Sequence, residues 1–382
     1  MDSKLIQRIL DLVVEIQQIP SPTFEEKKRA TFIRDQFLGM GAQDVIIDEA
    51  GNVCTHLIGR GERPPLIVSA HLDTVFPTGT DLTIHQTGDR IYGPGIGDNS
   101  LGLAGLFSLF LRFSENSELN KKNTSLEGDL WLVANVGEEG LGDLQGMKAI
   151  VDRFGSAPLA YLVLEGMSLG QIYVRGLGVR RYRIRVHTKG GHSWVDYGSP
   201  SAIHEIADLI VRIKGIEVPV EPRSSLNVGM IQGGTSVNTI AADASLELDL
   251  RSESPQSLSH LIEQVERLVE GANKLGQEAI QVSADIIGDR PAGHITVDHP
   301  LITTAIECFA HEGINVKLNI GSTDANAPLS RGFPAICMGL TMGGGSHTLG
   351  EYIEIKPISQ GLNILAELVQ SIFKSKNLPC NQ

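Results

Sequence analysis

Apolar residues near the start of the chain recur at the spacing of an amphipathic helix. This spacing predicts a helix over residues 4–18. Thr23 and Glu26 are three residues apart, as in a capping box, so we expect this pair to begin a second helix. The chain is therefore expected to open with two helices in succession.

Farther along, short apolar runs alternate with helical patterns. Strands are predicted at 45–47, 52–57, 66–71, 84–92, 130–136, 160–164, 316–320 and 335–340. Helices are predicted near 100–110, 148–153, 301–311, 325–330 and 359–374. Strands that alternate with helices are typical of an α/β layer structure.

The pattern changes after Gly176. Residues 179–188 alternate polar and apolar positions, as a half-exposed antiparallel strand does. A helix at 202–213, strands at 226–231 and 244–250, a helix at 256–275 and a strand at 280–287 are predicted to follow it. The resulting order β-α-β-β-α-β suits a small sheet with both helices on one face. We therefore predict a domain inserted at 177–290, within a discontinuous domain made of residues 1–176 and 291–382.

The composition narrows the range of partners and locations. With 382 residues the chain is long enough for two domains, and its formal net charge of −13 argues against binding to nucleic acid or to an anionic membrane. No run approaches the ~20 apolar residues of a membrane-spanning helix, and the first residues lack the apolar core of a signal peptide. The four cysteines are not spaced as metal ligands or as a redox pair, and we interpret them as reduced thiols. Because reduced thiols are typical of the cytoplasm, we expect a cytoplasmic protein.

Polar residues that can carry chemistry occur at the predicted strand ends and in glycine-rich loops. They are His71 and Asp73, Asp98, the pair Glu138 and Glu139, Glu165, and His347. In open α/β sheets ligands bind at the carboxyl ends of strands, so these side chains are expected to converge. Each has an ordinary alternative when taken alone, such as a buried histidine, a helix cap or a solvated loop residue. Their joint occurrence favours one shared site.

Two imidazoles and three carboxylates suit a pair of divalent metal ions. The predicted ligands are His71, Asp98, Glu139, Glu165 and His347. If one carboxylate bridges, each ion receives about three protein ligands, and this mixture of nitrogen and oxygen suits zinc. Two ions ~3.5–4 Å apart can polarise a carbonyl and activate water near neutral pH. Glu138, adjacent to a ligand, is then free to act as general base.

These motifs resemble those of the M20 family of metallopeptidases and amidohydrolases, and the resemblance covers almost the whole chain. His71-Leu72-Asp73 is similar to the family's first metal-site motif, which implies that His71 is a ligand and that Asp73 orients it. The glycine-rich segment that ends in Asp98 resembles the one that carries the bridging aspartate. Because many relatives continue from that aspartate through a cis peptide, a cis bond between Asp98 and Asn99 is expected.

The remaining motifs fit the same resemblance. Glu138-Glu139-Gly140 looks like the family's pair of general base and metal ligand. Glu165 takes a position where relatives carry Asp or Glu as a ligand. Glu is more typical of the carboxypeptidase and acylase branches, and Asp of the tripeptidase and dipeptidase branches, so this position argues against a tripeptidase. The segment from Ser346 to Glu351 resembles the motif of the last ligand, His347. The family's fold is a zinc-peptidase-like catalytic domain, with a central mixed sheet between helices, and an inserted ferredoxin-like α+β domain.

That inserted domain serves relatives as a lid and often as a dimerisation domain, which implies a homodimer here. Gly190-Gly191-His192-Ser193 resembles a signature whose histidine stabilises the developing oxyanion. Asn238 lies in a segment that contacts substrate in relatives, and either Arg290 or Arg251 is expected to hold a substrate carboxylate. The alternatives are an exposed histidine in a glycine turn, and arginines that form structural ion pairs.

The predicted function is therefore hydrolysis of an amide bond in a small peptide, by an enzyme whose class includes aminopeptidases and carboxypeptidases. A deacylase or amidohydrolase acting on N-acyl amino acids is the alternative within the family, and a metal-dependent binding protein without catalysis is a remote one. The expected cofactors are two divalent ions, zinc first and cobalt or manganese otherwise. A nucleotide-binding interpretation of the glycine loop at 93–97 lacks an acidic ribose partner and a P-loop lysine.

Overall fold

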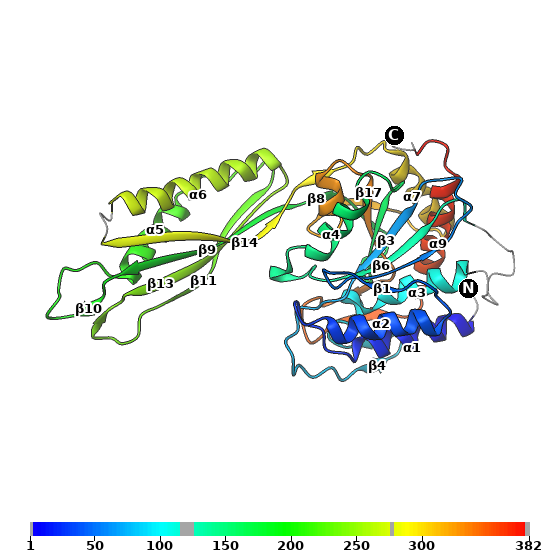
Figure 1. Ribbon diagram of the computed structural model, residues 1–382, viewed down its shortest axis with the longest axis horizontal. Coiled ribbons are helices and arrows are strands. Elements are labelled where there is room, and N and C mark those ends of the chain that lie inside the picture. Colours follow the sequence, from blue (N-terminus) through cyan, green and yellow to red (C-terminus); the bar gives the residue numbers. More distant parts are fainter. Residues whose placement is uncertain (1–2, 115–125, 276–278, 379–382) are drawn as a thin grey trace. The chain divides into compact units, whose positions relative to one another are not determined.

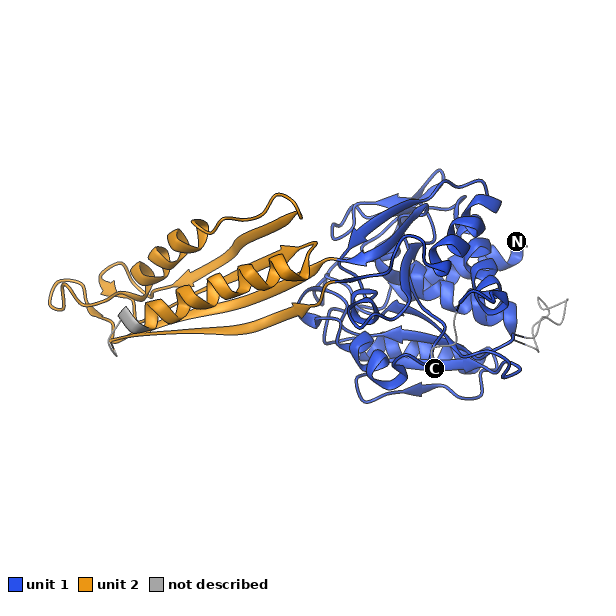
Figure 2. Ribbon diagram, turned by 90° about the horizontal axis from the view of Figure 1, so that it is seen from above, with its two compact units in different colours: residues 1–176, 293–382 blue, residues 177–292 orange. Residues whose placement is uncertain are grey.

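The computed structural model describes residues 3–114, 126–275 and 279–378 of the chain. Two compact units can be distinguished (Figure 2). Unit 1 comprises residues 1–176 and 293–382, and unit 2 comprises residues 177–292.

Unit 1 is built on a mixed sheet that has nine strands within the described part of the chain. They are β1 (Ile46–Ile47), β2 (Val53–Leu57), β3 (Leu66–His71), β6 (Leu130–Asn135), β7 (Tyr161–Glu165), β8 (Gln171–Gly176), β15 (Gly293–His294), β16 (Lys317–Gly321) and β17 (Ala335–Gly339). Neighbouring strands follow the order β1-β2-β6-β3-β7-β17-β8-β15, and β16 pairs with β8. β6, β3, β7 and β17 are mutually parallel at the centre, where continuous apolar runs suit strands covered on both faces.

Helices cover both faces of this sheet (Figure 1). They are α1 (Ser3–Gln17), α2 (Lys27–Gly39), α3 (Gly102–Phe113), α4 (Gln145–Phe154), α7 (Pro300–His311), α8 (Asn326–Ser330) and α9 (Ile358–Lys374). The chain crosses from β3 to β6 through α3, and then from β6 past β3 to β7 through α4. Such crossovers are right-handed, so these two, which run in opposite directions, place α3 and α4 on opposite faces. The reversal at β3 is the kind of position where α/β sheets bind ligands.

A second, small sheet of unit 1 carries two loops toward that position. Its strands are β4 (His85–Thr87), β5 (Arg90–Tyr92), β18 (Gly343–Gly344) and β19 (Tyr352–Glu354), in the order β18-β19-β5-β4. The loop after β5 leads into an irregular helical turn, Ile96–Leu101, which contains Asp98. His347 lies between β18 and β19.

Unit 2 contains the elements of its main sheet in the predicted order. They are β9 (Gly178–Thr188), α5 (Ala202–Lys214), β11 (Ser224–Gly233), β13 (Asp243–Ser252), α6 (Pro255–Leu275) and β14 (Ile280–Arg290), and the short strands β10 (Gly191–His192) and β12 (Thr239–Ile240) form a separate pair. The sheet order is β11-β13-β9-β14, antiparallel throughout. Alternation along β9 is confirmed, since Tyr182 and Ile184 are buried whereas Arg181 and Arg183 pair with acids of β13.

The predicted α/β class is confirmed, and one local expectation, the capping box of Thr23 and Glu26, is wrong. α2 begins after Glu26, which makes no side-chain cap, and the hydroxyl of Thr23 instead donates to the carboxylate of Asp73. β8 was not predicted, because Gln171–Gly176 contains only three apolar residues in a row, a run too short to indicate a strand.

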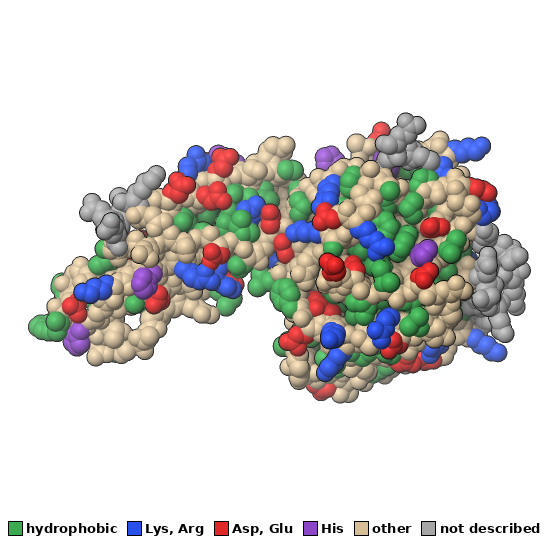
Figure 3. All heavy atoms as spheres, in the orientation of Figure 1, with side chains coloured by type: hydrophobic (Ala, Val, Ile, Leu, Met, Phe, Trp, Pro, Cys, Tyr) green, Lys and Arg blue, Asp and Glu red, His purple; other side chains and the backbone are tan. Residues whose placement is uncertain are grey.

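The described residues include no helix that is long and apolar enough to cross a membrane. Acidic and basic side chains are interspersed on the face of the molecule drawn in Figure 3.

Candidate metal centre and active site

The carboxyl ends of three parallel strands place acidic and histidine side chains next to one another. His71 is the last residue of β3, and Glu165 is the last residue of β7. β6 ends at Asn135, which pairs in register with His71, and the chain continues from there to Glu138 and Glu139. The predicted convergence at strand ends is therefore present in the structure.

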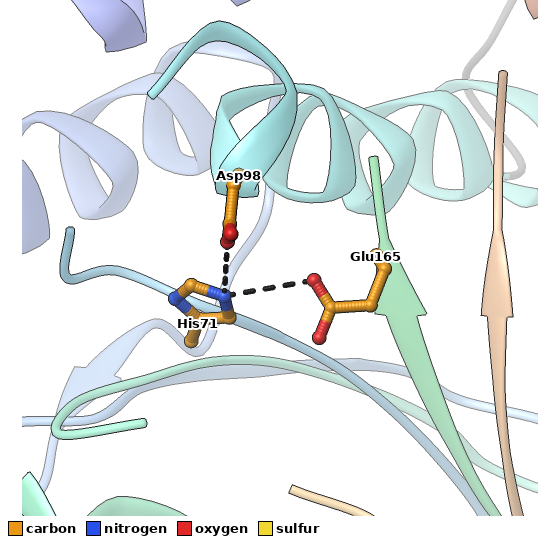
Figure 4. Close-up of side chains that lie close together, drawn as sticks. All are labelled: His71, Asp98 and Glu165. Carbon is orange, nitrogen blue, oxygen red and sulfur yellow. Dashed lines mark ion pairs between the residues drawn. The ribbon is translucent and has the colours of Figure 1, made fainter. Parts of the chain in front are cut away.

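Asp98 and Glu165 both point at one nitrogen of His71 (Figure 4). Nε2 of His71 lies 3.1 Å from Oδ1 of Asp98 and 3.7 Å from Oε2 of Glu165. The opposite ring nitrogen, Nδ1, lies 3.0 Å from the main-chain oxygen of Asp73, so a hydrogen on Nδ1 can be bonded there. Nε2 is then the atom that faces the carboxylates.

Asp98 also takes part in a second group. Its Oδ2 lies 3.3 Å from Nε2 of His347, and that nitrogen lies 3.2 Å from Oε1 of Glu139. The two groups of possible metal ligands, His71 with Asp98 and Glu165, and Asp98 with Glu139 and His347, therefore share one aspartate. The carboxylate of Glu138 lies within reach of the same cluster, since it groups with His71 and Glu139.

The side chain of Asp73 binds the main chain of Glu138 and Glu139. Oδ1 of Asp73 accepts the N–H of Glu138 at 2.9 Å, and Oδ2 accepts the N–H of Glu139 at 2.8 Å. Oδ2 also accepts the hydroxyl hydrogen of Thr23 at 2.9 Å. Oδ1 lies 3.5 Å from Nδ1 of His71, farther than the main-chain oxygen of Asp73. The carboxylate thus connects the end of β3 to the segment after β6.

The pKa shifts reflect an excess of acidic groups in a buried place. Burial lowers the pKa of His71, but Asp73, Asp98 and Glu165 outweigh that effect and raise it well above its usual range. Hydrogen bonds to Asp98 and Glu139 raise the pKa of His347 to about 10. Burial raises the pKa of Glu165 to about 7, while both histidines outweigh burial at Asp98 and lower its pKa.

The main-chain N–H groups of the glycine loop before Asp98 are already bonded to an acidic side chain of this chain. The main-chain N–H groups of Gly95, Gly97 and Asp98 donate to the carboxylate of Glu351. Main-chain N–H groups that converge in this way are what a phosphate would bind, so the nucleotide-binding interpretation is not supported. The expected cis peptide between Asp98 and Asn99 is present.

The other predicted site residues belong to unit 2. His192 is exposed, and its Nδ1 accepts the N–H of Trp194 at 3.2 Å. Its strand β10 pairs with β12, which follows directly after Asn238, so these two predicted residues lie on neighbouring segments. Arg251 bonds Oδ2 of Asp249 through Nε at 2.7 Å, as in the alternative of a structural ion pair, whereas Arg290 is almost fully buried at the end of β14.

Several residues near the site were missed by the sequence analysis. Thr23 supports Asp73 as described above, and Nδ2 of Asn135 donates to Oδ2 of the buried Asp324 at 2.7 Å. Asp324 also raises the pKa of Glu165, after the larger effect of burial and the charge of Asp98. The positions of Asn135 at a strand end and of Asp324 just before α8 could have pointed to them.

The fold and this cluster define a class, namely hydrolases that depend on metal ions held at the carboxyl edge of an α/β sheet. The model of peptidase family M20/M25/M40 matches residues 67–371, and the chain belongs to this family. The chain is thus a metallopeptidase or amidohydrolase, as the motifs around His71 and Glu138 predicted.

Individual proteins agree with this assignment. Acetylornithine deacetylase from Klebsiella pneumoniae (strain 342) is 26% identical over 333 residues, which cover 80% of this chain and 79% of that protein. A tripeptidase from Staphylococcus aureus has a similar structure, with a TM-score of 0.78, 22% identity and coverage of 97% of this chain and 99% of the other. The YXEP protein of Bacillus subtilis, described as a dinuclear metal binding peptidase from M20 family, gives a TM-score of 0.68 at 16% identity, with coverage of 98% and 99%.

Proposed function

We propose that this protein hydrolyses an amide bond in small peptides, with two divalent metal ions bound by His71, Asp98, Glu139, Glu165 and His347. One observation carries the proposal: two groups of three ligand residues share Asp98, and Glu138 lies beside them. A shared carboxylate between two groups of nitrogen and oxygen donors is what a bridged pair of ions requires.

The donor set fits such ions. The cluster combines two imidazoles with several carboxylates, and it is acidic enough to raise the pKa of both histidines. Bound there, two divalent ions would polarise the scissile carbonyl and make water a better nucleophile near neutral pH. Zinc is the first candidate for this mixture of ligands, and cobalt and manganese are alternatives.

The residues of the chain would divide the remaining work. Glu138 takes the proton from the attacking water and passes it to the leaving nitrogen, as a general base and then a general acid. Asp73 keeps Glu138 and Glu139 in place through their N–H groups. The roles predicted for His192 with the oxyanion, and for Asn238, Arg251 and Arg290 with substrate, remain predictions, as do a homodimer through unit 2 and a cytoplasmic location.

We prefer peptides as substrates because a structural neighbour is described as a tripeptidase. Deacylation of N-acyl amino acids is the second candidate, favoured by the likeness in sequence to an acetylornithine deacetylase. Both reactions break an amide bond and need the same water, base and metal ions, so the site geometry alone favours neither.

The test is hydrolysis by the purified chain, first stripped by a chelator and then supplied with Zn²⁺, Co²⁺ or Mn²⁺. Di- and tripeptides are compared with N-acetyl and N-succinyl amino acids at equal concentrations. We expect peptide cleavage that chelation abolishes and metal restores. Cleavage of acylated amino acids alone would select the deacylase, and activity unaffected by chelation would refute the metal-dependent mechanism.

A further inference from the structure

The loop that carries Asp98 is held by a carboxylate that has no part in the mechanism above. Oε1 of Glu351 accepts the main-chain N–H groups of Gly97 at 2.7 Å and of Asp98 at 2.8 Å, and Oε2 accepts that of Gly95 at 3.1 Å. Glu351 is fully buried. Its two oxygens accept three main-chain N–H groups, so one side chain fixes the backbone of the loop from Gly95 to Asp98.

Glu351 itself belongs to the segment that carries His347. Its N–H donates to the main-chain oxygen of Thr348, and its own main-chain oxygen accepts the N–H of Gly93 at 2.9 Å. The next residue, Tyr352, opens β19 and pairs with Tyr92 at the end of β5. The loop with Asp98 and the turn with His347 therefore leave the same end of the small sheet, and Glu351 connects them.

This connection bears on one pair of side chains. Oδ2 of Asp98 and Nε2 of His347 lie 3.3 Å apart, and the proposed function requires them to bind one ion together. The side chain of His347 is 54% exposed, so packing gives it little support, and its place depends on the turn that ends at Glu351. A movement of either segment would change the spacing of these two ligands.

We propose that Glu351 is a positioning residue that sets the spacing of Asp98 and His347, and thereby the affinity of the metal ion these two ligands share. The proposal rests on the proposed function, because it assumes that a metal ion binds there. Residues that orient metal ligands typically change metal affinity or activity about 10–100-fold when they are replaced.

Glutamine at this position keeps the size of the side chain and removes its charge. Its oxygen could still accept the N–H groups of Gly97 and Asp98, but its amide nitrogen would face the N–H of Gly95, donor against donor. Aspartate keeps the carboxyl group, but its side chain is shorter by one methylene. Neither change creates a large cavity, and the two variants together test the position of the carboxylate, so the test does not depend on the folding of a single variant.

The matched control is Glu354→Gln. Glu354 lies three residues farther on, at the end of β19, and bonds Arg90 at 2.8 Å. It is partly exposed, and among the described residues it makes no hydrogen bond to the loop at 93–98. The control therefore removes a carboxylate from the same strand while leaving the proposed connection intact.

The experiment is a calorimetric titration of the metal-free full chain with Mn²⁺, whose weak binding within the divalent series makes the affinities measurable. Wild type and Glu354→Gln are expected to bind two ions alike. Glu351→Gln and Glu351→Asp are expected to bind one ion at least about tenfold more weakly, with kcat reduced about 10–100-fold at low Mn²⁺ and partly restored at high Mn²⁺. The metal-free variants are expected to stay folded, with a melting temperature lower by several degrees, because a buried N–H loses its acceptor.

Three results would overturn the role of Glu351. They are wild-type Mn²⁺ titrations for both Glu351 variants, an equal loss in Glu354→Gln, and lower melting temperatures with unchanged metal binding. A wild-type chain that binds no divalent ion would instead refute the proposed function, so the two failures are distinguishable.

Discussion

Oδ1 of Asp73 accepts the main-chain N–H of Glu138 at 2.9 Å, although 65 positions separate the two residues in the chain. The other oxygen makes the same bond to Glu139. One buried carboxylate therefore fixes the backbone of the proposed base and of the proposed ligand beside it. The proposed base, Glu138, and the proposed ligand, Glu139, therefore both depend on Asp73, which has neither of these roles.

Replacing Asp73 by Asn should damage catalysis more than folding. An amide can accept from only one of the two N–H groups, and its own NH₂ would face the other. We expect kcat to fall about 10–100-fold, with weaker metal binding, as for other residues that orient metal ligands. Thr23→Val, which removes only the hydroxyl that donates to Asp73, is the control and should cost less. Equal kcat values for Asp73→Asn and wild type, at saturating metal, would contradict the assignment.

Glu138→Gln should separate catalysis from metal binding. Glutamine has nearly the shape of glutamate but cannot take a proton from water, and general bases contribute about 10²–10⁴-fold to rates. We expect kcat to fall by that factor, while metal content measured by elemental analysis stays at the wild-type value. Glu139→Gln is the contrasting variant and should lose metal as well. A Glu138→Gln enzyme with full activity would show that another group activates the water.

Metal binding should release protons and weaken as the pH falls. Imidazole binds metal only when its coordinating nitrogen is free of a proton, and the pKa of His347 is raised to about 10, with that of His71 also raised. Near neutral pH both rings are then imidazolium ions in the metal-free chain, so binding of two ions should release about two protons. Glu165, whose pKa is about 7, should release a further fraction of a proton.

Calorimetry in buffers of different ionisation enthalpy measures this number directly. The apparent affinity should rise with pH until the pKa values of the histidines are passed. His347→Ala is the control, and it should release about one proton fewer. Heats that do not depend on the buffer would mean that the two rings are already neutral.

The convergence of the predicted site residues could be predicted from the sequence, but the contacts that hold them in place could not. His71 and Glu165 end apolar runs, and an α/β sheet brings such strand ends together whatever the details of packing. The bonds from Thr23 to Asp73 and from the loop at 95–98 to Glu351 join segments 50 and more than 250 positions apart. No local spacing encodes such contacts, and Thr23 gave a misleading signal because its distance from Glu26 fits a helix cap.

Unit 2 offers a test of a different kind, through His192→Ala. The resemblance to the family predicts that this histidine stabilises the developing oxyanion, and removing one such donor typically lowers kcat about 10²–10³-fold. His192 is exposed and contributes no ligand to the groups around Asp98, so metal content and melting temperature should stay unchanged. His204→Ala, on α5 of the same unit, is the control. Steady-state rates equal to those of wild type would mean that His192 has no catalytic role and is an exposed residue in a glycine turn.

Arg29 links the stability of unit 1 to the geometry of the site. It is 2% exposed, and its guanidinium donates to the main-chain oxygens of Ile19 at 2.6 Å and of Leu72 at 2.9 Å. Burial lowers the pKa of Arg29 to about 10, so the side chain stays charged near neutral pH. Leu72 lies between His71 and Asp73, and the bond to its oxygen therefore supports both residues.

In Arg29→Met the apolar stem is retained, and the buried oxygen of Leu72 and the partly buried oxygen of Ile19 lose this donor. We expect the free energy of unfolding to fall by about 2–4 kcal/mol, since each unsatisfied buried acceptor costs about 1–3 kcal/mol. Arg34→Met, on the exposed side of the same helix, should change it by less than about 0.5 kcal/mol. Urea unfolding of the metal-free chain measures both. Because the support of the main chain at Leu72 is also lost, kcat of Arg29→Met should fall even where the enzyme is fully folded, and an unchanged kcat would confine Arg29 to a role in stability.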